Sequence, residues 1–273
     1  MKAFIKKFIP SPLLKLLRKS NTAENSFAPR FDPLKHKGDD VKCNICGATY
    51  STFGTFGIVP RHNAYCFNCG SLERHRILWK FLNEETGFLK SGNIRLLHIA
   101  PEKSFYHLFD DNPQIEYTAA DLNPENYKNY GLSKVVESDI TNLPFEENSF
   151  DLIICNHVLE HIPDDIKAMK ELFRVMKTGG TGIFMIPINC HPKPSGFDDE
   201  VTYEDFTINT GEGRLKAFGQ DDHVRVYGND YAIRLRSVGF NYYEFDYTER
   251  LSAEDLFRLG ISNGDVVQYC TKS

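Results

Sequence analysis

Residues 133–187 constrain the fold of this chain more than any other part. A short apolar segment ends at Asp139, and residues 152–155 form a second run that is apolar enough to be buried on both faces of a sheet. Strands buried on both faces are typical of parallel sheets, in which helices cover the two sides. The stretch therefore predicts part of an α/β domain.

A helix is predicted directly after the second of these strands. Asp164 and Asp165 supply capping oxygens and negative charge at its start. Apolar side chains then recur at helical spacing, and we expect Gly179 and Gly180 to end the helix before a third strand at residues 181–186. Strand, helix and strand joined by tight connections predict a parallel sheet.

The motifs in this stretch resemble those of class I S-adenosylmethionine (SAM) dependent methyltransferases of the type 11 kind. The similarity lies in VLEHIPDD at residues 158–165 and KTGG at residues 177–180, and it covers about residues 93–273. The resemblance implies a Rossmann-like sheet with helices on both faces and SAM-dependent methyl transfer. It also implies that Asp139 faces the adenine of the cofactor and that residues 156–161 border the transfer site.

The segment IRLLHIAPEKSF, residues 94–105, departs from the family's pattern where a first strand and a Gly-rich turn are expected. Glycines at such a turn let the backbone approach the cofactor, whereas this chain has Ala100, Glu102 and Ser104 there. His98 stands where the family usually has an acid. We expect Glu102 to supply a negative charge that faces the positive methionyl end of SAM.

Two acids lie at predicted strand ends. Asp121 comes 23 residues after His98, the spacing at which an acid accepts hydrogen bonds from ribose hydroxyls in such folds, and Asp139 follows 18 residues later. Either acid alone could be a helix cap or a turn residue, but together with the motifs they predict a cofactor site. The residues predicted for it are His98, Ala100, Glu102, Asp121, Leu122, Asp139, Ile140 and Asn156.

Four of the seven cysteines form two CxxC pairs with 19 residues between them. Two thiolates from one tight turn can reach the same ion, and the glycine after each pair, Gly47 and Gly70, suits such a turn. The spacing predicts a structural zinc ion in a zinc-ribbon-like module, with a redox pair or unligated thiols as alternatives. It also favours a reducing, cytoplasmic location. The predicted ligands are Cys43, Cys46, Cys66 and Cys69.

The chain divides into three parts. Residues 1–40 hold a basic amphipathic segment and a linker, residues 41–92 hold the cysteine module and a connecting helix capped by Ser71, and residues 93–273 form the methyltransferase-like domain. Residues 1–19 carry six Lys or Arg and no acid, so they can lie on the inner face of a membrane or pack on the protein itself. No apolar run approaches the length of about 18 residues that a membrane span needs.

Residues 188–227 form a long irregular segment. Its length predicts a lid-like or acceptor-binding insertion, because loops this long in compact domains are usually functional or disordered. The insertion closes with FGQDDHVRVYG, a polar cluster that indicates acceptor recognition or, alternatively, a surface network of Asp and Arg. We expect Asn229 or Asp230 to cap the next helix. Residues 242–246 and 266–271 then supply the final strands.

Histidines are the candidate catalytic residues. If the acceptor is a hydroxyl, a base must take its proton, and neutral imidazole titrates near working pH. We favour His223, because neighbouring acids can orient it, over His157, His161 and His191. A structural role for any of these residues remains open.

Charge is distributed unevenly along the chain. Residues 93–273 carry 17 Lys or Arg against 30 Asp or Glu. A domain this acidic repels RNA, so the sequence predicts a small-molecule, sugar or glycan-type acceptor. One alternative is a ribosomal RNA methyltransferase whose cysteine module, with Arg61, Arg74 and Arg76, recognises RNA. The other is a non-catalytic binding protein with a degenerate methyltransferase domain.

Overall fold

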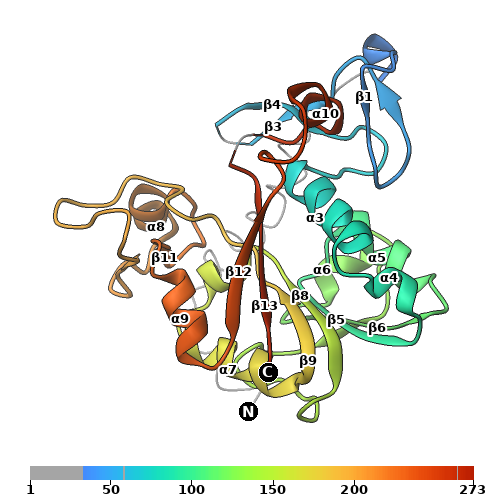
Figure 1. The fold of residues 1–273 in the computed structure, drawn as a ribbon. Coiled ribbons are helices and arrows are strands. Elements are labelled where there is room, and N and C mark those ends of the chain that lie inside the picture. Colours follow the sequence, from blue (N-terminus) through green and yellow to red (C-terminus); the bar gives the residue numbers. More distant parts are fainter. Residues whose placement is uncertain (1–32, 58, 263) are drawn as a thin grey trace. The chain divides into compact units, whose positions relative to one another are not determined.

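The structure, a computed structural model, describes residues 33–57, 59–262 and 264–273 (Figure 1). These residues form two compact units. The smaller unit comprises the residues up to Arg76 together with Ser252–Ser262, and the larger comprises Ile77–Leu251 and the C-terminal strand. The basic segment of residues 1–19 and most of the predicted linker lie outside the described residues.

A seven-stranded sheet forms the centre of the larger unit, in the order β12-β13-β9-β8-β5-β6-β7 (Figure 1). Its strands are parallel except for β13, which runs antiparallel to both of its neighbours. This arrangement confirms the predicted parallel sheet with an antiparallel end. The strands are β5 (Ile94–Ile99), β6 (Ile115–Asp121), β7 (Val135–Glu137), β8 (Phe150–Cys155), β9 (Met176–Ile183), β12 (Asn241–Asp246) and β13 (Val266–Thr271).

Helices cover both faces of this sheet, as predicted. Figure 1 shows α7 (Asp165–Val175) and α9 (Tyr231–Ser237) on one side and α5 (Lys103–Asp110) on the other. Leu172 of α7 and Leu235 of α9 are completely buried against Ile153 of β8 in the main hydrophobic core. The carboxylate of Asp164 caps α7, as predicted, by accepting a hydrogen bond from the Lys167 amide. The other helices of this region are α3 (Glu73–Glu84), α4 (Phe88–Ser91) and α6 (Glu125–Lys128).

The KTGG segment does not end the helix, contrary to the prediction. α7 ends at Val175, which is four residues before Gly179, and β9 begins at the next residue. Residues 177–180 bulge out of the ladder that β9 forms with β8. Gly179 has a φ of +79°, and a Cβ on Gly180 would lie 2.8 Å from the carbonyl oxygen of Lys177. The glycines therefore permit a bulge within the strand.

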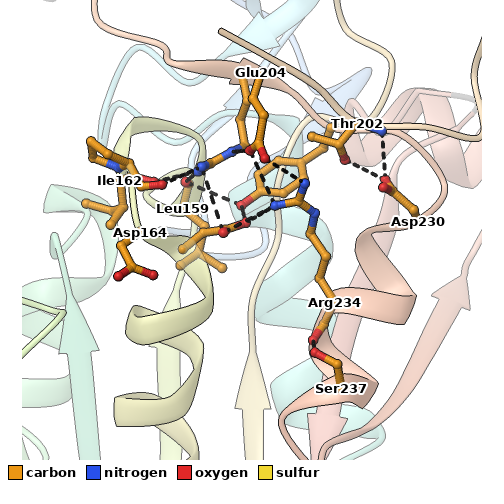
Figure 2. Close-up of polar contacts among 12 residues, drawn as sticks. Leu159, Ile162, Asp164, Thr202, Glu204, Asp230, Arg234 and Ser237 are labelled. Atoms are coloured by element: carbon orange, nitrogen blue, oxygen red, sulfur yellow. Dashed lines mark hydrogen bonds and ion pairs between the residues drawn. The ribbon is translucent and has the colours of Figure 1, made fainter. Parts of the chain in front are cut away.

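The insertion of residues 188–227 is folded. It contains α8 (Gly211–Phe218) and two short antiparallel strands, β10 (Tyr203–Glu204) and β11 (Arg225–Val226). Asp230, one of the two predicted helix caps, makes no capping bond to α9. Its carboxylate accepts hydrogen bonds from the amide and the hydroxyl of Thr202 instead, which ties the insertion to the start of α9 (Figure 2).

The smaller unit combines the cysteine segment with a helix from near the C-terminus. Its elements are η2 (Pro33–His36), the pair β1 (Val41–Lys42) and β2 (Thr49–Tyr50), the pair β3 (Gly54–Phe56) and β4 (Arg61–Tyr65), and α10 (Ala253–Leu259). The sequence had grouped residues 252–262 with the methyltransferase-like domain, whereas the structure packs them with the cysteines.

A buried arginine joins the parts of the smaller unit. Arg76 has no exposed surface, and its guanidinium lies 4.1 Å from the centre of the Phe53 ring. Because Arg76 is buried, it cannot take part in an RNA-binding surface of the kind that the sequence suggested. Its hydrogen bonds go to the carbonyl oxygens of Ala64, Ser71, Leu259 and Gly260.

Candidate functional site

The strand order of the larger unit reverses between β5 and β8. The chain continues from β5 to β6 and β7 on one side, then returns to β8 on the other side of β5. In open α/β sheets, ligands bind at the carboxyl ends of the strands where such a reversal opens a crevice. The side chains at the ends of β5, β6 and β8 are therefore the candidate cofactor site.

Glu102 lies at the centre of a hydrogen-bond network at this edge. One carboxylate oxygen accepts a hydrogen bond of 3.1 Å from the Asn156 amide, and the other contacts Nε2 of His98. His98 is completely buried, and its Nδ1 lies 3.0 Å from the hydroxyl of Tyr117. The side chain of Glu102 retains 14% of its exposure. His98 and Asn156 therefore hold the carboxyl group of Glu102 in a fixed orientation at this edge of the sheet.

Two residues at this edge have backbone conformations that favour glycine. Ala100, directly after β5, has a φ of +49°, and His157, just after β8, has a φ of +53°. A left-handed conformation costs an L-residue roughly 1–2 kcal/mol, and such strain concentrates at functional sites. Ala100 thus adopts a backbone conformation that a glycine would take without strain.

Asp121 is held in a defined orientation at the end of β6. One oxygen accepts a hydrogen bond of 2.7 Å from the Asn123 amide, and the other accepts one of 2.9 Å from the Tyr127 hydroxyl. A carboxylate has about four lone-pair positions, so about two remain for a ligand. The next residue, Leu122, is 60% exposed and places apolar surface beside the carboxylate. This pairing suits a nucleoside, which has hydroxyls and an apolar ring.

Asp139 and Ile140 follow β7. Asp139 is exposed, and its Oδ1 accepts hydrogen bonds of 2.8 Å from both the amide and the hydroxyl of Thr141. Ile140 is only 6% exposed and belongs to the main core. Asp139 is therefore accessible to a ligand, whereas most of Ile140 is not. Their role at the adenine remains a prediction.

Three of the four candidate histidines gather around one buried carboxylate. Glu160 lies in the short helix η3 (Leu159–His161), and Nδ1 of His157 lies 3.4 Å from one of its oxygens. The rings of His161 and His223 meet edge to face, with 4.7 Å between their centres. The sequence predicted these histidines but missed Glu160, although it is the acid of the VLEH motif. His191 contacts the Lys216 carbonyl instead.

Burial shapes the protonation of this cluster. It lowers the pKa of His223 below its usual value, and the charge of His161 adds to the effect. For Glu160, burial alone would raise the pKa, but the imidazoles of His157 and His161 outweigh it and hold the pKa below its usual value. The cluster therefore favours a carboxylate and a neutral His223.

A second buried arginine fixes the geometry of this cluster. Arg225 of β11 has no exposed side-chain surface, and its Nε donates a hydrogen bond of 2.9 Å to Glu204. Arg234 of α9 pairs with the same carboxylate (Figure 2) and also with Asp165. Arg225 thus belongs to an internal clamp, whereas Gln220, Asp221 and Asp222 of the same polar segment are exposed. The other hydrogen bonds of Arg225 go to the carbonyl oxygens of Leu159, Ile162 and Pro163.

The four predicted metal ligands lie together in the smaller unit. Their sulfur atoms are all within 4.8 Å of one another, and two of the separations are 3.7 Å. A tetrahedral zinc ion with bonds of about 2.3 Å to sulfur requires sulfur–sulfur distances of about 3.8 Å. Gly47 and Gly70 have φ values of +76° and +74°, as the turns require. The arrangement fits a four-thiolate zinc site.

Ser71 does not cap the connecting helix, contrary to the prediction. α3 begins only at Glu73, and the Ser71 hydroxyl lies 3.3 Å from the sulfur of Cys43 and 3.2 Å from that of Cys69. It therefore belongs to the surroundings of the sulfur cluster, where a hydroxyl can donate to a thiolate.

None of the helices in the described part of the chain is long and apolar enough to cross a membrane.

Part of the larger unit is similar to known proteins. Residues 102–184 match the family model described as a methyltransferase domain. An uncharacterized protein of Methanocaldococcus jannaschii is 32% identical over 127 residues, which cover 46% of this chain and 52% of that protein. The demethylmenaquinone methyltransferase of Staphylococcus haemolyticus is 40% identical over 60 residues, covering 22% of this chain and 25% of that protein.

A third relative extends the range of named acceptors. The sterol 4-C-methyltransferase strm-1 of Caenorhabditis elegans is 39% identical over 64 residues, covering 22% of this chain and 19% of that protein. The chain spans about half the length of the first relative and a quarter or less of the other two. The matched segment includes the VLEH and KTGG motifs, and the sheet around it has the order and direction described above. The larger unit of this chain is therefore similar to methyltransferase domains of the class I, SAM-dependent kind.

Proposed function

We propose that this protein transfers a methyl group from SAM to a hydroxyl or similar nucleophile of a small-molecule, sugar or glycan-type acceptor. The observation that carries the proposal is the edge of the sheet at the ends of β5, β6 and β8, where Glu102 and Asp121 are both held in place by hydrogen bonds. Glu102 would face the positive methionyl end of SAM and Asp121 the ribose. Asp139 would lie near the adenine.

SAM, when bound, would supply a methyl group that its sulfonium activates for transfer, and a hydroxyl acceptor would lose its proton in that transfer. The protein must hold the acceptor in line and take that proton. Because residues 156–161 follow β8, the histidines around Glu160 lie at the same edge of the sheet as Glu102 and Asn156. His157, His161 and His223 are the candidates for that role.

We expect Asp121→Ala to weaken SAM binding, because a charge-assisted contact to the ribose is worth roughly 1.5–3 kcal/mol. This corresponds to an increase in Kd of about 10-fold to 150-fold, measured by calorimetry on the full chain. Asp111→Ala is the matched control, because Asp111 is an exposed aspartate directly after the C-terminal end of α5. Equal affinity of Asp121→Ala and wild type would contradict the role assigned to Asp121. No SAM binding by the wild type would favour the non-catalytic alternative.

We also propose that the four cysteines hold one structural zinc ion. With four protein ligands the metal has no open position, so it would stabilise the module and take no part in the chemistry. The sulfur separations near 3.7 Å support this assignment.

A small acceptor is favoured over RNA by the charges and contacts of the chain. The domain of residues 93–273 is acidic. In the smaller unit Arg76 is buried and Arg61 is paired with Glu73 at 2.8 Å, so two of the three arginines that could face phosphates are committed elsewhere. The names of two relatives refer to a demethylmenaquinone and a sterol, which are small molecules.

The acceptor class and the N-terminal segment can be tested together. At physiological salt we expect negligible binding of single-stranded RNA and measurable co-sedimentation with anionic vesicles that is lost when residues 1–19 are removed. Neutral vesicles are the control. Tight RNA binding that falls steeply with salt, with methyl groups incorporated into the RNA, would overturn this proposal in favour of the ribosomal alternative.

A further inference from the structure

We infer that Glu160, His161 and His223 form a second metal site, for a divalent transition-metal ion, beside the expected transfer site. Each side chain offers one ligand atom, and these atoms lie within 4.8 Å of one another. The binding of the ion does not depend on the proposed function, whereas its role in methyl transfer does.

The buried carboxylate of Glu160 is the main observation that indicates a bound cation. Its side chain is 2% exposed, and neither oxygen has a hydrogen-bond partner. Nδ1 of His157 lies 3.4 Å from one oxygen but is not aligned for a hydrogen bond. A buried carboxylate that accepts no hydrogen bond is unfavourable, and buried charges are normally paired or coordinate metals. A divalent cation bound to one of the oxygens would add to the positive charge that the imidazole of His157 can supply.

The two histidines have ring nitrogens free to complete the site. His223 is 2% exposed, and its Nδ1 is buried without a hydrogen-bond partner. Nδ1 of His161 lies 3.4 Å from the carbonyl oxygen of Asp222 and 3.5 Å from its carboxylate, which leaves Nε2 as the ligand. In metal sites the second nitrogen of a ligating imidazole regularly donates to a carbonyl or carboxylate, which fixes the ring.

The backbone around the cluster holds the three ligands in place before any ion binds. The amide of Val224 donates a hydrogen bond of 3.0 Å to the carbonyl oxygen of Glu160, so His223 is positioned beside η3. Arg225 strengthens this link through its hydrogen bond to the Leu159 carbonyl. Ligands held by such supporting contacts lose little conformational freedom when the metal arrives.

The ligand set indicates the class of metal. Two imidazoles and one carboxylate suit Zn²⁺, Fe²⁺ or Mn²⁺ better than Ca²⁺ or Mg²⁺. With bonds of about 2.0–2.2 Å the ligand atoms would lie about 3–3.6 Å apart, so the side chains need to close by only about an ångström. Three protein ligands leave at least one coordination position open, in contrast to the four-cysteine site.

The open position gives the ion a role in methyl transfer. An acceptor hydroxyl bound there would have a lower pKa, because the cation stabilises its deprotonated form. The oxygen would form its bond to the methyl carbon while the carbon–sulfur bond of SAM breaks with its electron pair on sulfur. The proton would pass to His157, which is partly exposed and is the histidine left unligated. His223 would then be a ligand rather than the base.

The site can be tested with Mn²⁺ on the full, zinc-loaded protein. Mn²⁺ prefers oxygen and imidazole ligands to thiolates, so it should not displace zinc from the cysteines. Electron paramagnetic resonance detects the Mn²⁺ that stays free in solution. We expect a titration followed in this way to show one Mn²⁺ bound per chain. Glu160→Gln and His223→Gln should each weaken binding at least about tenfold, since each removes one of three protein ligands. His107→Gln, at an exposed histidine on α5, should leave binding unchanged.

SAM calorimetry on the same variants separates metal loss from unfolding, since we expect cofactor affinity to be retained. His161→Gln changes a residue that is 30% exposed and tests the site if the buried variants do not fold. Absence of Mn²⁺ and Co²⁺ binding beyond the zinc equivalent, or binding that survives these substitutions, would overturn the metal site. Binding of Mn²⁺ without any SAM binding would support the metal site and contradict the proposed methyltransferase activity.

Discussion

Replacing Cys66 with serine is expected to unfold the cysteine module and release its zinc ion. Zinc binding to such sites contributes about 10–16 kcal/mol to folding in small zinc-finger peptides, more than most domains have in total stability. A serine hydroxyl is a poor replacement for a thiolate. We expect the variant to contain well below one zinc per chain by metal analysis and to aggregate on purification, because Cys66 belongs to the module's small buried core with Val41 and Phe53.

Cys190→Ser is the matched control, because Cys190 is exposed and lies outside the module. It should keep one equivalent of zinc and the thermal unfolding midpoint of the wild type. Wild-type protein with less than about half an equivalent of zinc, and no loss of stability in a chelator, would show that the cysteines are not a structural metal site.

Replacing Arg225 with methionine should lower the free energy of unfolding of the larger unit by about 3–5 kcal/mol, the usual cost of breaking a buried ion pair by removing one partner. Methionine fills similar volume but removes the hydrogen bonds that the guanidinium donates to three carbonyl oxygens. Glu204 would keep only Arg234 as its partner. Urea unfolding at equilibrium, followed by circular dichroism, measures the change.

Two further variants isolate the cause. Arg225→Lys keeps the charge but cannot reproduce the planar set of guanidinium donors. Its free energy of unfolding should therefore fall between those of Arg225→Met and the wild type. Lys170→Met removes an exposed charge from α7 and should change stability by less than about 0.5 kcal/mol. If Arg225→Met behaved like Lys170→Met, the clamp would not be a significant source of stability.

Local sequence patterns were sufficient to predict the sheet and the cysteine cluster. Apolar runs located β8 within two residues at its start, and β13 was predicted with its observed bounds. The CxxC spacing brought the four cysteines together because each pair is confined to one tight turn. These features depend on neighbours in the chain, which a pattern can capture.

The errors arose where partners are distant in sequence. For Arg225 the sequence suggested acceptor recognition or a surface network, because nothing near it in sequence predicts carbonyl partners more than 60 positions away. Ser71 was predicted as a helix cap, but its hydroxyl contacts the sulfur of Cys43, which lies 28 residues earlier in the chain. Glu160 was overlooked for the same reason, since its importance depends on His223 being brought beside it by the insertion.

The packing of α10 with the cysteine module has a consequence for the order of folding during synthesis. The ribosome produces the four cysteines first, but two carbonyl partners of Arg76 belong to Leu259 and Gly260, which follow it by 183 and 184 residues. Until these residues have been synthesised, the guanidinium of Arg76 lacks two of its four carbonyl partners. A chain that ends before residue 252 never acquires them, so such a truncation should destabilise the cysteine module as well.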